Sequence, residues 1–518
     1  MSMIKAISQV GSLTLISRVL GFMRDVLMAR YLGAAFVADC FFVAFKLPNF
    51  FRRLFAEGAF GAAFVPMFVE ELGDGSQGHK ARAKLFAEQA LAILLPILVV
   101  FTLLMQAFMP WVMYLLAPGF VDDAEKYALA VEFTRSTFPY LMLISLVALF
   151  SGVTNGNGRF AAGAQAPILL NTVLIGSLLL FNNGELMTGQ ALTRAVSIAG
   201  AVQLIWMARA VARIDFSLRL RWPRLSPKVK ELMVIMLPAV IGAGAIQINL
   251  VIDIILASFL PEGSLSYLFY ADRLNQLPIG VIGVAVGTVL LPVIARSLAA
   301  GDLERAKYDQ NRAVEFSMFL TVPAAVAMVV IPLPLITAMF ERGAFEAQDS
   351  LATAQALMAY AMGLPAYILI KVLTPSFFSR KDTKTPVKIG IAAMFVNTIL
   401  NLILMGPLLH VGLALATAIS AWVNAIALYV VMRKRGHFSF DSRVMRRLPR
   451  IIAAAVLMGC GLWFVADQMM AFLYGSVMEK MAYIGLLVVG GVAVYALCAL
   501  GLKAMSMSEI KAYMRRRA

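Results

Sequence analysis

Residues 7–29 read ISQVGSLTLISRVLGFMRDVLMA, a hydrophobic run long enough to cross a bilayer that nevertheless contains Arg18, Arg24 and Asp25. The next hydrophobic run, at about residues 36–60, contains Asp39, Lys46, Arg52, Arg53 and Glu57. Ionisable groups at bilayer depth cost at least ~2.5–3.5 kcal/mol each, so they normally face a bundle interior or a wet cavity. Their net charge here is positive, and the planar fork of arginine suits bidentate capture of phosphate. This pattern indicates a membrane protein with an anionic cargo.

Hydrophobic composition extends this conclusion to the whole chain. The chain has 518 residues, of which 61% are hydrophobic and 14% charged, and its mean hydropathy is +0.83. Hydrophobic stretches of about 20 residues recur, each long enough for a bilayer core of ~30 Å, and they lack the alternation of barrel strands. The sequence therefore predicts an all-α polytopic membrane protein with fourteen spans, at about residues 7–29, 36–60, 84–108, 127–153, 162–181, 189–208, 231–256, 267–292, 312–339, 351–375, 387–406, 411–431, 451–471 and 482–502.

Basic residues are concentrated in alternate connections between these spans. One set of loops includes the basic stretches from Arg209 to Lys230, from Arg433 to Arg450 and from Lys503 to Arg517. The other set contains only Arg30, Lys126, Arg342 and Lys480. The positive-inside rule then predicts that both termini are cytoplasmic, which requires an even number of spans. The formal net charge of +16 follows from this topology and from attraction to anionic headgroups, so nucleic-acid binding is not needed to explain it.

The chain also contains signs of an internal repeat at an offset of 226 residues. Helix-breaking prolines and polar residues recur at this offset: Asn49 with Asn275, Pro66 with Pro292, Pro139 with Pro365, and Asn171-Thr172 with Asn397-Thr398. An offset of six spans preserves direction, so the repeat is parallel and the cargo site is expected between two similar lobes. The predicted domains are an N-terminal lobe (1–215), a basic cytoplasmic linker (216–230), a C-terminal lobe (231–435), and two further spans with a basic tail (436–518).

Several long motifs make the chain similar to one known family. They are SRVLGFMRD at 17–25, ADCFFVAFKLPN at 38–49, RRLFAEGAF at 52–60, YADRL at 270–274 and SRKDTKTP at 379–386. Together they resemble the MurJ (MviN) family, the lipid II flippases of bacterial peptidoglycan synthesis. The resemblance covers essentially the whole chain. It implies the fold of the multidrug/oligosaccharidyl-lipid/polysaccharide exporter superfamily: two pseudo-symmetric six-helix lobes in a V-shape around a cationic cavity, plus two C-terminal helices whose groove holds a lipid tail.

The resemblance also implies the cargo and its ligands. Lipid II is an undecaprenyl pyrophosphate that carries a disaccharide-pentapeptide, and Arg18, Arg24, Arg52 and Arg273 would bind its headgroup. Their charge-assisted hydrogen bonds would replace hydration that the pyrophosphate loses. Without cargo, Asp25 and Asp39 would pair with these arginines. Further candidates for gating or charge pairing are Arg53, Glu57 and Asp272.

An alternative role for these charges is cross-bracing between helices. The surplus of positive charge favours the cargo site, because a cross-brace needs no surplus. Three other basic residues within spans, Arg135, Arg194 and Lys371, are isolated and have no role that the sequence assigns. Gln276 stands where relatives can have an acidic residue, which leaves the details of gating open.

A second polar group is a candidate site for a coupling cation. Asp253 lies within the seventh predicted span, Asn397 and Asn401 share a face of the eleventh, and Thr417 lies in the twelfth. One carboxylate with amide and hydroxyl oxygens suits sodium, and some proteins of the MurJ type are thought to hold sodium between these helices. The alternative is that these residues are polar contacts between packed helices. Cys40, Cys460 and Cys498 show no metal-ligand spacing.

These observations predict a lipid II flippase that works by alternating access, with no covalent chemistry, no cofactor other than Na⁺ as a candidate coupling ion, and no P-loop for ATP. Expected partners are lipid II, membrane lipids and cell-wall synthesis proteins, and the expected location is the bacterial inner membrane. The alternatives are a flippase for another polyprenyl-linked oligosaccharide and a multidrug exporter of the same fold. An exporter of cationic drugs would ordinarily have an acidic or aromatic cavity, whereas this chain is rich in arginine.

Overall fold

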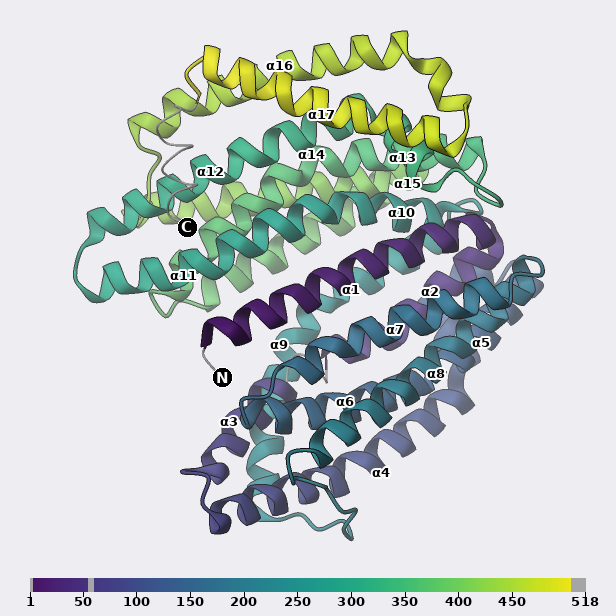
Figure 1. Ribbon diagram of the computed structural model, residues 1–518, viewed down its shortest axis with the longest axis vertical. Coiled ribbons are helices and arrows are strands. Elements are labelled where there is room, and N and C mark those ends of the chain that lie inside the picture. Colours follow the sequence, from purple (N-terminus) through teal and green to yellow (C-terminus); the bar gives the residue numbers. More distant parts are fainter. Residues whose placement is uncertain (1–2, 55–59, 505–518) are drawn as a thin grey trace. The chain divides into compact units, whose positions relative to one another are not determined.

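The computed structural model describes residues 3–54 and 60–504, and over these residues the chain forms helices and no strand (Figure 1). Contacts divide the chain into two compact units. The first unit comprises Met1–Ser266 and Arg342–Phe345, and the second comprises Tyr267–Glu341 and Glu346–Ala518. The predicted all-α fold class is confirmed.

The first unit contains nine α-helices of the described chain. They are α1 (Met3–Leu32), α2 (Phe36–Phe51), α3 (Gly61–Leu72), α4 (Gln77–Leu116), α5 (Ala124–Thr137), α6 (Pro139–Gly156), α7 (Ala161–Leu180), α8 (Glu185–Ala212) and α9 (Pro227–Ser258). The repeat predicts that residues 231–256 belong to the second lobe, whereas the contacts group α9 with the first unit.

The second unit begins within α10, at Tyr267, because the first residues of this helix belong to the first unit. Its helices are α10 (Ser264–Pro278), the π-helical η3 (Ile279–Gly283), α11 (Val284–Ala299), α12 (Leu303–Val330), α13 (Pro332–Phe340), α14 (Ala347–Phe378), α15 (Lys384–Lys434), α16 (Ser442–Gln468) and α17 (Val477–Gly501). The α15 segment joins two predicted spans, because its backbone breaks at Leu409, where φ is 49°.

Nine helices of the described chain are long and apolar enough to cross a membrane, judged by length and composition. One of the nine is α15, which covers two predicted spans, and another combines α5 and α6. The helices α2, α10 and α11, each next to a π-helical turn, are too short for this count. A multi-pass membrane protein is therefore supported, and the number of fourteen spans stays a prediction.

The two interrupted helices agree with the internal repeat. A π-helical turn follows α2 at residues 52–54, and a second, η3, follows α10 at Ile279–Gly283. Adding the repeat offset of 226 to 53 gives 279, so both interruptions occur at equivalent places. A π-helical turn inside a helix is uncommon and often marks a functional region. The repeat therefore extends from sequence to local backbone geometry.

Prolines inside these helices create specific tertiary contacts. Proline lacks an N–H, so the carbonyl four residues earlier loses its helical hydrogen bond. Because of Pro48, the carbonyl of Ala44 has no helical N–H donor. The Thr137 hydroxyl donates to that oxygen instead, at 2.8 Å. A released carbonyl in a membrane needs a partner of this kind, because hydrocarbon supplies none. The pair fixes α2 against the end of α5.

The same reasoning assigns a structural role to Arg135. Pro110 releases the carbonyl of Gln106, and Arg135 Nε donates to it at 3.2 Å. In return, Pro139 releases the carbonyl of Arg135, and Gln106 Nε2 donates to that oxygen at 2.8 Å. Two prolines on different helices are thus compensated by one reciprocal pair of side chains, which joins α4 to α5.

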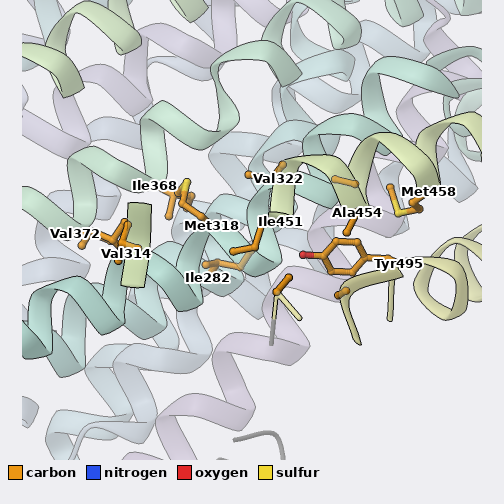
Figure 2. Packing of buried hydrophobic residues seen from close by; sticks show 14 of the residues in the cluster. Ile282, Val314, Met318, Val322, Ile368, Val372, Ile451, Ala454, Met458 and Tyr495 are labelled. Carbon is orange, nitrogen blue, oxygen red and sulfur yellow. The ribbon is translucent and has the colours of Figure 1, made fainter. Parts of the chain in front are cut away.

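The hydrophobic core of the second unit anchors the two C-terminal helices. Figure 2 shows Ile451, Ala454 and Met458 of α16 in the same cluster as Val314, Met318 and Val322 of α12. Tyr495 of α17 lies in this cluster, and its hydroxyl donates to the carbonyl of Phe319 at 2.8 Å. Pro323 releases that carbonyl, so α17 is held on α12 by a further contact of the same kind.

We expect Tyr495→Phe to lower the free energy of unfolding by about 1–3 kcal/mol, because the released Phe319 carbonyl is left buried without a donor. The measurement is thermal or denaturant unfolding of the purified protein in detergent. Tyr127→Phe is the matched control, since Tyr127 donates to Pro110 O at 2.6 Å, a carbonyl inside α4 for which Tyr114, four residues later, has a helical N–H. Equal losses in the two variants would contradict the assignment.

Candidate functional site

Arg24 of α1 is a buried arginine that three fixed contacts orient. Its Nε and Nη2 donate to Asp25 Oδ1 at 2.9 and 2.6 Å, and its Nη1 donates to Asn171 Oδ1 at 3.0 Å. The Phe45 ring lies 5.8 Å from its guanidinium carbon. Arginine has five N–H donors, so two of them are not used by these contacts. The predicted pairing of Asp25 with a cargo-site arginine is therefore present.

Asn171 of α7 completes this arrangement, and the functional prediction had missed it. Its Nδ2 donates to the carbonyl of Ser17 at 3.0 Å, while its Oδ1 accepts from Arg24. The Asn-Thr pair in the internal repeat was the available signal, since a polar residue recurring inside two spans indicates a specific contact.

The other first-unit arginines lie nearby in sequence but in different surroundings. Arg18 is exposed on α1, less than two turns before Arg24. Arg52 is half-buried in the π-helical turn after α2, where its Nε donates to Asn49 Oδ1 at 3.1 Å. Asn49 in turn donates to the carbonyl of Phe45, whose ring faces Arg24. A series of contacts therefore runs from Arg52 through Asn49 and Phe45 to Arg24.

A cavity of about 300 Å³ lies beside this group, between α1, α6 and α7. Its polar lining consists of Thr14, Ser17, Ser151 and Asn155, with apolar walls from residues such as Phe160 and Pro167. Ser17 is shared between the cavity and the Arg24 site, because its carbonyl accepts from Asn171. Hydroxyl and amide groups of this kind suit a polar, uncharged part of a ligand.

The sequence predicts that Asp39 pairs with an arginine, but in the structure Asp39 pairs with a lysine. It is buried at the start of α2 and pairs with Lys126 at 3.3 Å. It also accepts hydrogen bonds from Gly263 N (2.9 Å), Ser266 N (3.0 Å) and Ser266 Oγ (2.7 Å) at the beginning of α10. A carboxylate at a helix N-terminus satisfies backbone donors that lack helical partners. Asp39 is thus a cap for α10, which is a structural role.

The other residues predicted to take part in gating or charge pairing are Arg53, Glu57 and Asp272. Glu57 lies outside the described residues, so the predicted pair of Arg53 and Glu57 stays a prediction. In the second unit, Asp272 Oδ2 accepts from Gln276 Nε2 at 3.0 Å. The guanidinium carbon of Arg273 lies 4.4 Å from the centre of the Phe269 ring, on the same helix. The role of Arg273 in cargo binding stays a prediction.

The candidate cation residues belong to two different units. Asn397, Asn401 and Thr417 are linked on α15: Asn397 Nδ2 donates to Thr417 Oγ1 at 3.4 Å, and Asn401 Nδ2 donates to Asn397 Oδ1 at 3.2 Å. Asp253 lies on α9 of the first unit and accepts from Asn249 Nδ2 at 3.2 Å. No cluster of three His, Cys, Asp or Glu side chains occurs in residues 3–54 or 60–504. Sodium binding stays a prediction.

The motif at residues 379–386 forms the turn between α14 and α15. Hydrogen bonds from the hydroxyl and backbone N–H of Thr385, together with one from Arg435, lower the pKa of Asp382 to about 2. A lowered carboxyl pKa stabilises the fold above the unfolded pKa of ~3.9, and this contribution is lost as pH falls toward 2. The motif is therefore a structural turn that closes a helix hairpin.

We expect Asn171→Leu to weaken binding of a polyprenyl pyrophosphate lipid about tenfold or more, because a hydrogen bond to a charged group contributes about 1.5–3 kcal/mol. The substitution removes the amide oxygen that accepts from Nη1 of Arg24, so the guanidinium loses one of its fixed directions. The measurement is ligand titration of purified protein. Asn182→Leu, at an exposed turn, should bind normally; equal weakening in both would count against the assignment.

Comparisons with known proteins agree with this chemistry. The family model described as "Lipid II flippase MurJ" matches residues 28–483. A Rhizobium tropici protein named "Probable lipid II flippase MurJ" is 41% identical over 524 residues, which covers 100% of this chain and 97% of that protein. A Burkholderia cenocepacia protein named "Lipid II flippase MurJ" is 34% identical over 462 residues, covering 88% of this chain and 89% of that protein.

Among solved structures, a lipid II flippase is more similar to this chain than a multidrug transporter is. A structure described as "Lipid II flippase MurJ, inward closed conformation" is 26% identical and has a TM-score of 0.78, covering 95% of this chain and 97% of that one. A multidrug transporter of the MATE family in an inward-facing conformation is 16% identical, with a TM-score of 0.66 and coverage of 83% and 98%. The second likeness concerns the fold alone.

Proposed function

Because this chain belongs to the lipid II flippase MurJ family, we propose that its membrane-embedded arginines carry the pyrophosphate of lipid II across the bilayer. The protein is a lipid II flippase and a multi-pass bacterial membrane protein. The observation that carries the residue assignment is the burial of Arg24, 7% exposed, with two N–H donors left for a ligand.

The chemistry of the cargo fits these donors. A pyrophosphate leaving water loses strong hydration, and charge-assisted hydrogen bonds from guanidinium groups replace it at short range. Asp25 and Asn171 hold Arg24 in place before the cargo arrives, so little reorganisation accompanies binding. Arg18 and Arg52 supply further positive charge from the same unit, and Arg273 is a proposed contact from the second unit. Thr14, Ser17, Ser151 and Asn155 offer hydrogen-bonding groups to the uncharged sugars of the headgroup.

We propose that transport proceeds by alternating access from the inner to the outer leaflet of the cytoplasmic membrane. The headgroup enters the protein while the polyprenyl tail stays in lipid, and both chain termini are cytoplasmic by the positive-inside rule. Membrane potential is one source of work, at ~2.3 kcal/mol per charge and 100 mV. Sodium held by Asn397, Asn401 and Thr417, with Asp253, is a second source. The process involves no covalent chemistry, and cell-wall synthesis proteins are expected partners.

The test uses purified protein in vesicles with a fluorescent lipid II and a membrane-impermeant quencher. Wild-type protein should expose nearly all the fluorescent lipid to the quencher, whereas protein-free vesicles should expose only the outer half. A lipid-linked oligosaccharide with the same pyrophosphate but another glycan is the specificity control. Preferential movement of that second lipid would show that it, and not lipid II, is the cargo. If neither lipid moves, the assignment is overturned.

A further inference from the structure

The connection between α8 and α9, residues 213–226, is an ordered segment attached to the first unit. Its Phe216 is buried against Phe68, with ring centroids 5.7 Å apart. Further along, the backbone N–H of Arg219 and Nε of Arg221 donate to the buried carboxylate of Glu88, at 3.0 and 2.5 Å. This segment, part of which the sequence predicts as an interdomain linker, packs against α3 through Phe216 and against α4 through Glu88.

The last residue of the connection makes a second attachment. Ser226 Oγ donates to Gln89 Oε1 at 2.7 Å and also accepts from Val229 N as the N-cap of α9. Residues 219–226 are therefore held at the level of Glu88 and Gln89 at both of their ends. The segment between these attachments, Leu220–Leu225, is called the interfacial segment below.

The level of Glu88 and Gln89 on α4 coincides with the membrane boundary. Before this point α4 carries Lys80, Arg82 and Lys84, and from Ala90 onward it reads ALAILLPILVVFTLLM. A change from charged to apolar residues along one helix marks where the hydrocarbon core begins. The interfacial segment thus lies within about one turn of that boundary.

Large apolar side chains of the interfacial segment point away from the protein. Trp222 is 83% exposed, Leu220 66% and Leu225 67%. Arg219 and Arg224, also exposed, alternate with them. Apolar patches on a protein surface normally have a partner, and tryptophan beside arginine is typical of the layer where acyl chains meet headgroups.

We propose that the interfacial segment inserts into the headgroup layer of the adjoining leaflet, with Trp222 and its leucines toward the acyl chains and the arginines on lipid phosphates. The occupant follows from charge complementarity and from the level of the segment on α4. Attachment by Glu88 and Gln89 keeps the segment ordered before contact, which lowers the entropic cost of binding. Insertion of the interfacial segment into the headgroup layer does not depend on which cargo the protein carries.

The test measures the immersion of position 222 in the full-length protein. Cys40, Cys460 and Cys498 are replaced by Ala, Trp222→Cys is added, and a nitroxide is attached. The protein is placed in vesicles of phosphatidylcholine and phosphatidylglycerol, and collision rates with oxygen and with a water-soluble nickel complex are compared. Gln77→Cys, exposed on the charged part of α4, reports water, and Leu104→Cys, 51% exposed, reports lipid.

The nickel collision rate at position 222 is expected to be low. It should lie closer to the rate at position 104, in lipid, than to the rate at position 77, in water. Adding Arg219→Gln and Arg224→Gln should return the label toward water in anionic vesicles and change it less in pure phosphatidylcholine. Arg221 is left intact because its side chain holds Glu88. A label at 222 as exposed to nickel as that at 77 would overturn the proposal and leave a soluble protein as the partner of this surface.

Discussion

Arg24→Ala is expected to abolish measurable lipid II transport. The substitution removes two N–H donors that Arg24 has left for a phosphate, and each such charge-assisted hydrogen bond contributes about 1.5–3 kcal/mol. Together they correspond to a loss of at least about 100-fold in affinity or rate. The measurement is quencher accessibility of fluorescent lipid II in vesicles that contain the purified variant.

Two further variants separate charge from geometry at this position. Arg24→Lys keeps the positive charge but not the planar fork, so it should restore only part of the activity. Arg159→Ala removes an exposed basic residue and should transport normally. Because Arg24→Ala also removes the ion pair with buried Asp25, the amount of folded protein is measured by size-exclusion chromatography. Full transport by folded Arg24→Ala would contradict the assigned role.

Asp39→Ala is expected to have the largest effect on stability. Asp39 is 2% exposed, and its removal leaves the Lys126 ammonium, 9% exposed, without its carboxylate and the start of α10 without a cap. Breaking a buried pair by removing one partner costs about 3–5 kcal/mol. The expected result is a markedly lower unfolding temperature of the purified protein, measured by intrinsic fluorescence.

A double-mutant cycle distinguishes the ion pair from the cap. Lys126→Met in the Asp39→Ala background removes the unpaired ammonium and should recover part of the lost stability. The unrecovered part reports the hydrogen bonds to Gly263 and Ser266. Asp122→Ala is the control, since Asp122 is exposed in a turn and should change little. Wild-type stability of Asp39→Ala would contradict the buried pair and the cap together.

Much of the fold was predictable because hydrophobic length is a direct physical constraint. Each predicted span is a run that must bury its backbone hydrogen bonds internally, so each becomes a helix where the structure describes it. The interruption of two helices at the same repeat offset was foreshadowed by matched residues such as Asn49 and Asn275. The grouping of α9 with the first unit was not predictable, since repeat spacing does not determine which helices pack together.

The site was predictable in its residue types but less so in its partners. Arginines inside apolar runs indicated an anion, and the pairing of Arg24 with Asp25 followed from adjacency. The pairing of Asp39 with Lys126 was missed, because an 87-residue separation carries no periodic signal. Arg135 was isolated in sequence, although Pro110 and Pro139 each release a carbonyl that reaches across to the other helix. Such contacts emerge only when two helices are placed side by side.

The most direct test of the central claim is the amount of lipid II accessible on the outer face of cells. Cells are depleted of this protein and then supplied with the wild type or with Arg24→Ala, in a strain without a second flippase. The account predicts that outer-face lipid II falls on depletion and that only the wild type restores it. Unchanged outer-face lipid II after depletion would contradict the claim that this protein moves lipid II.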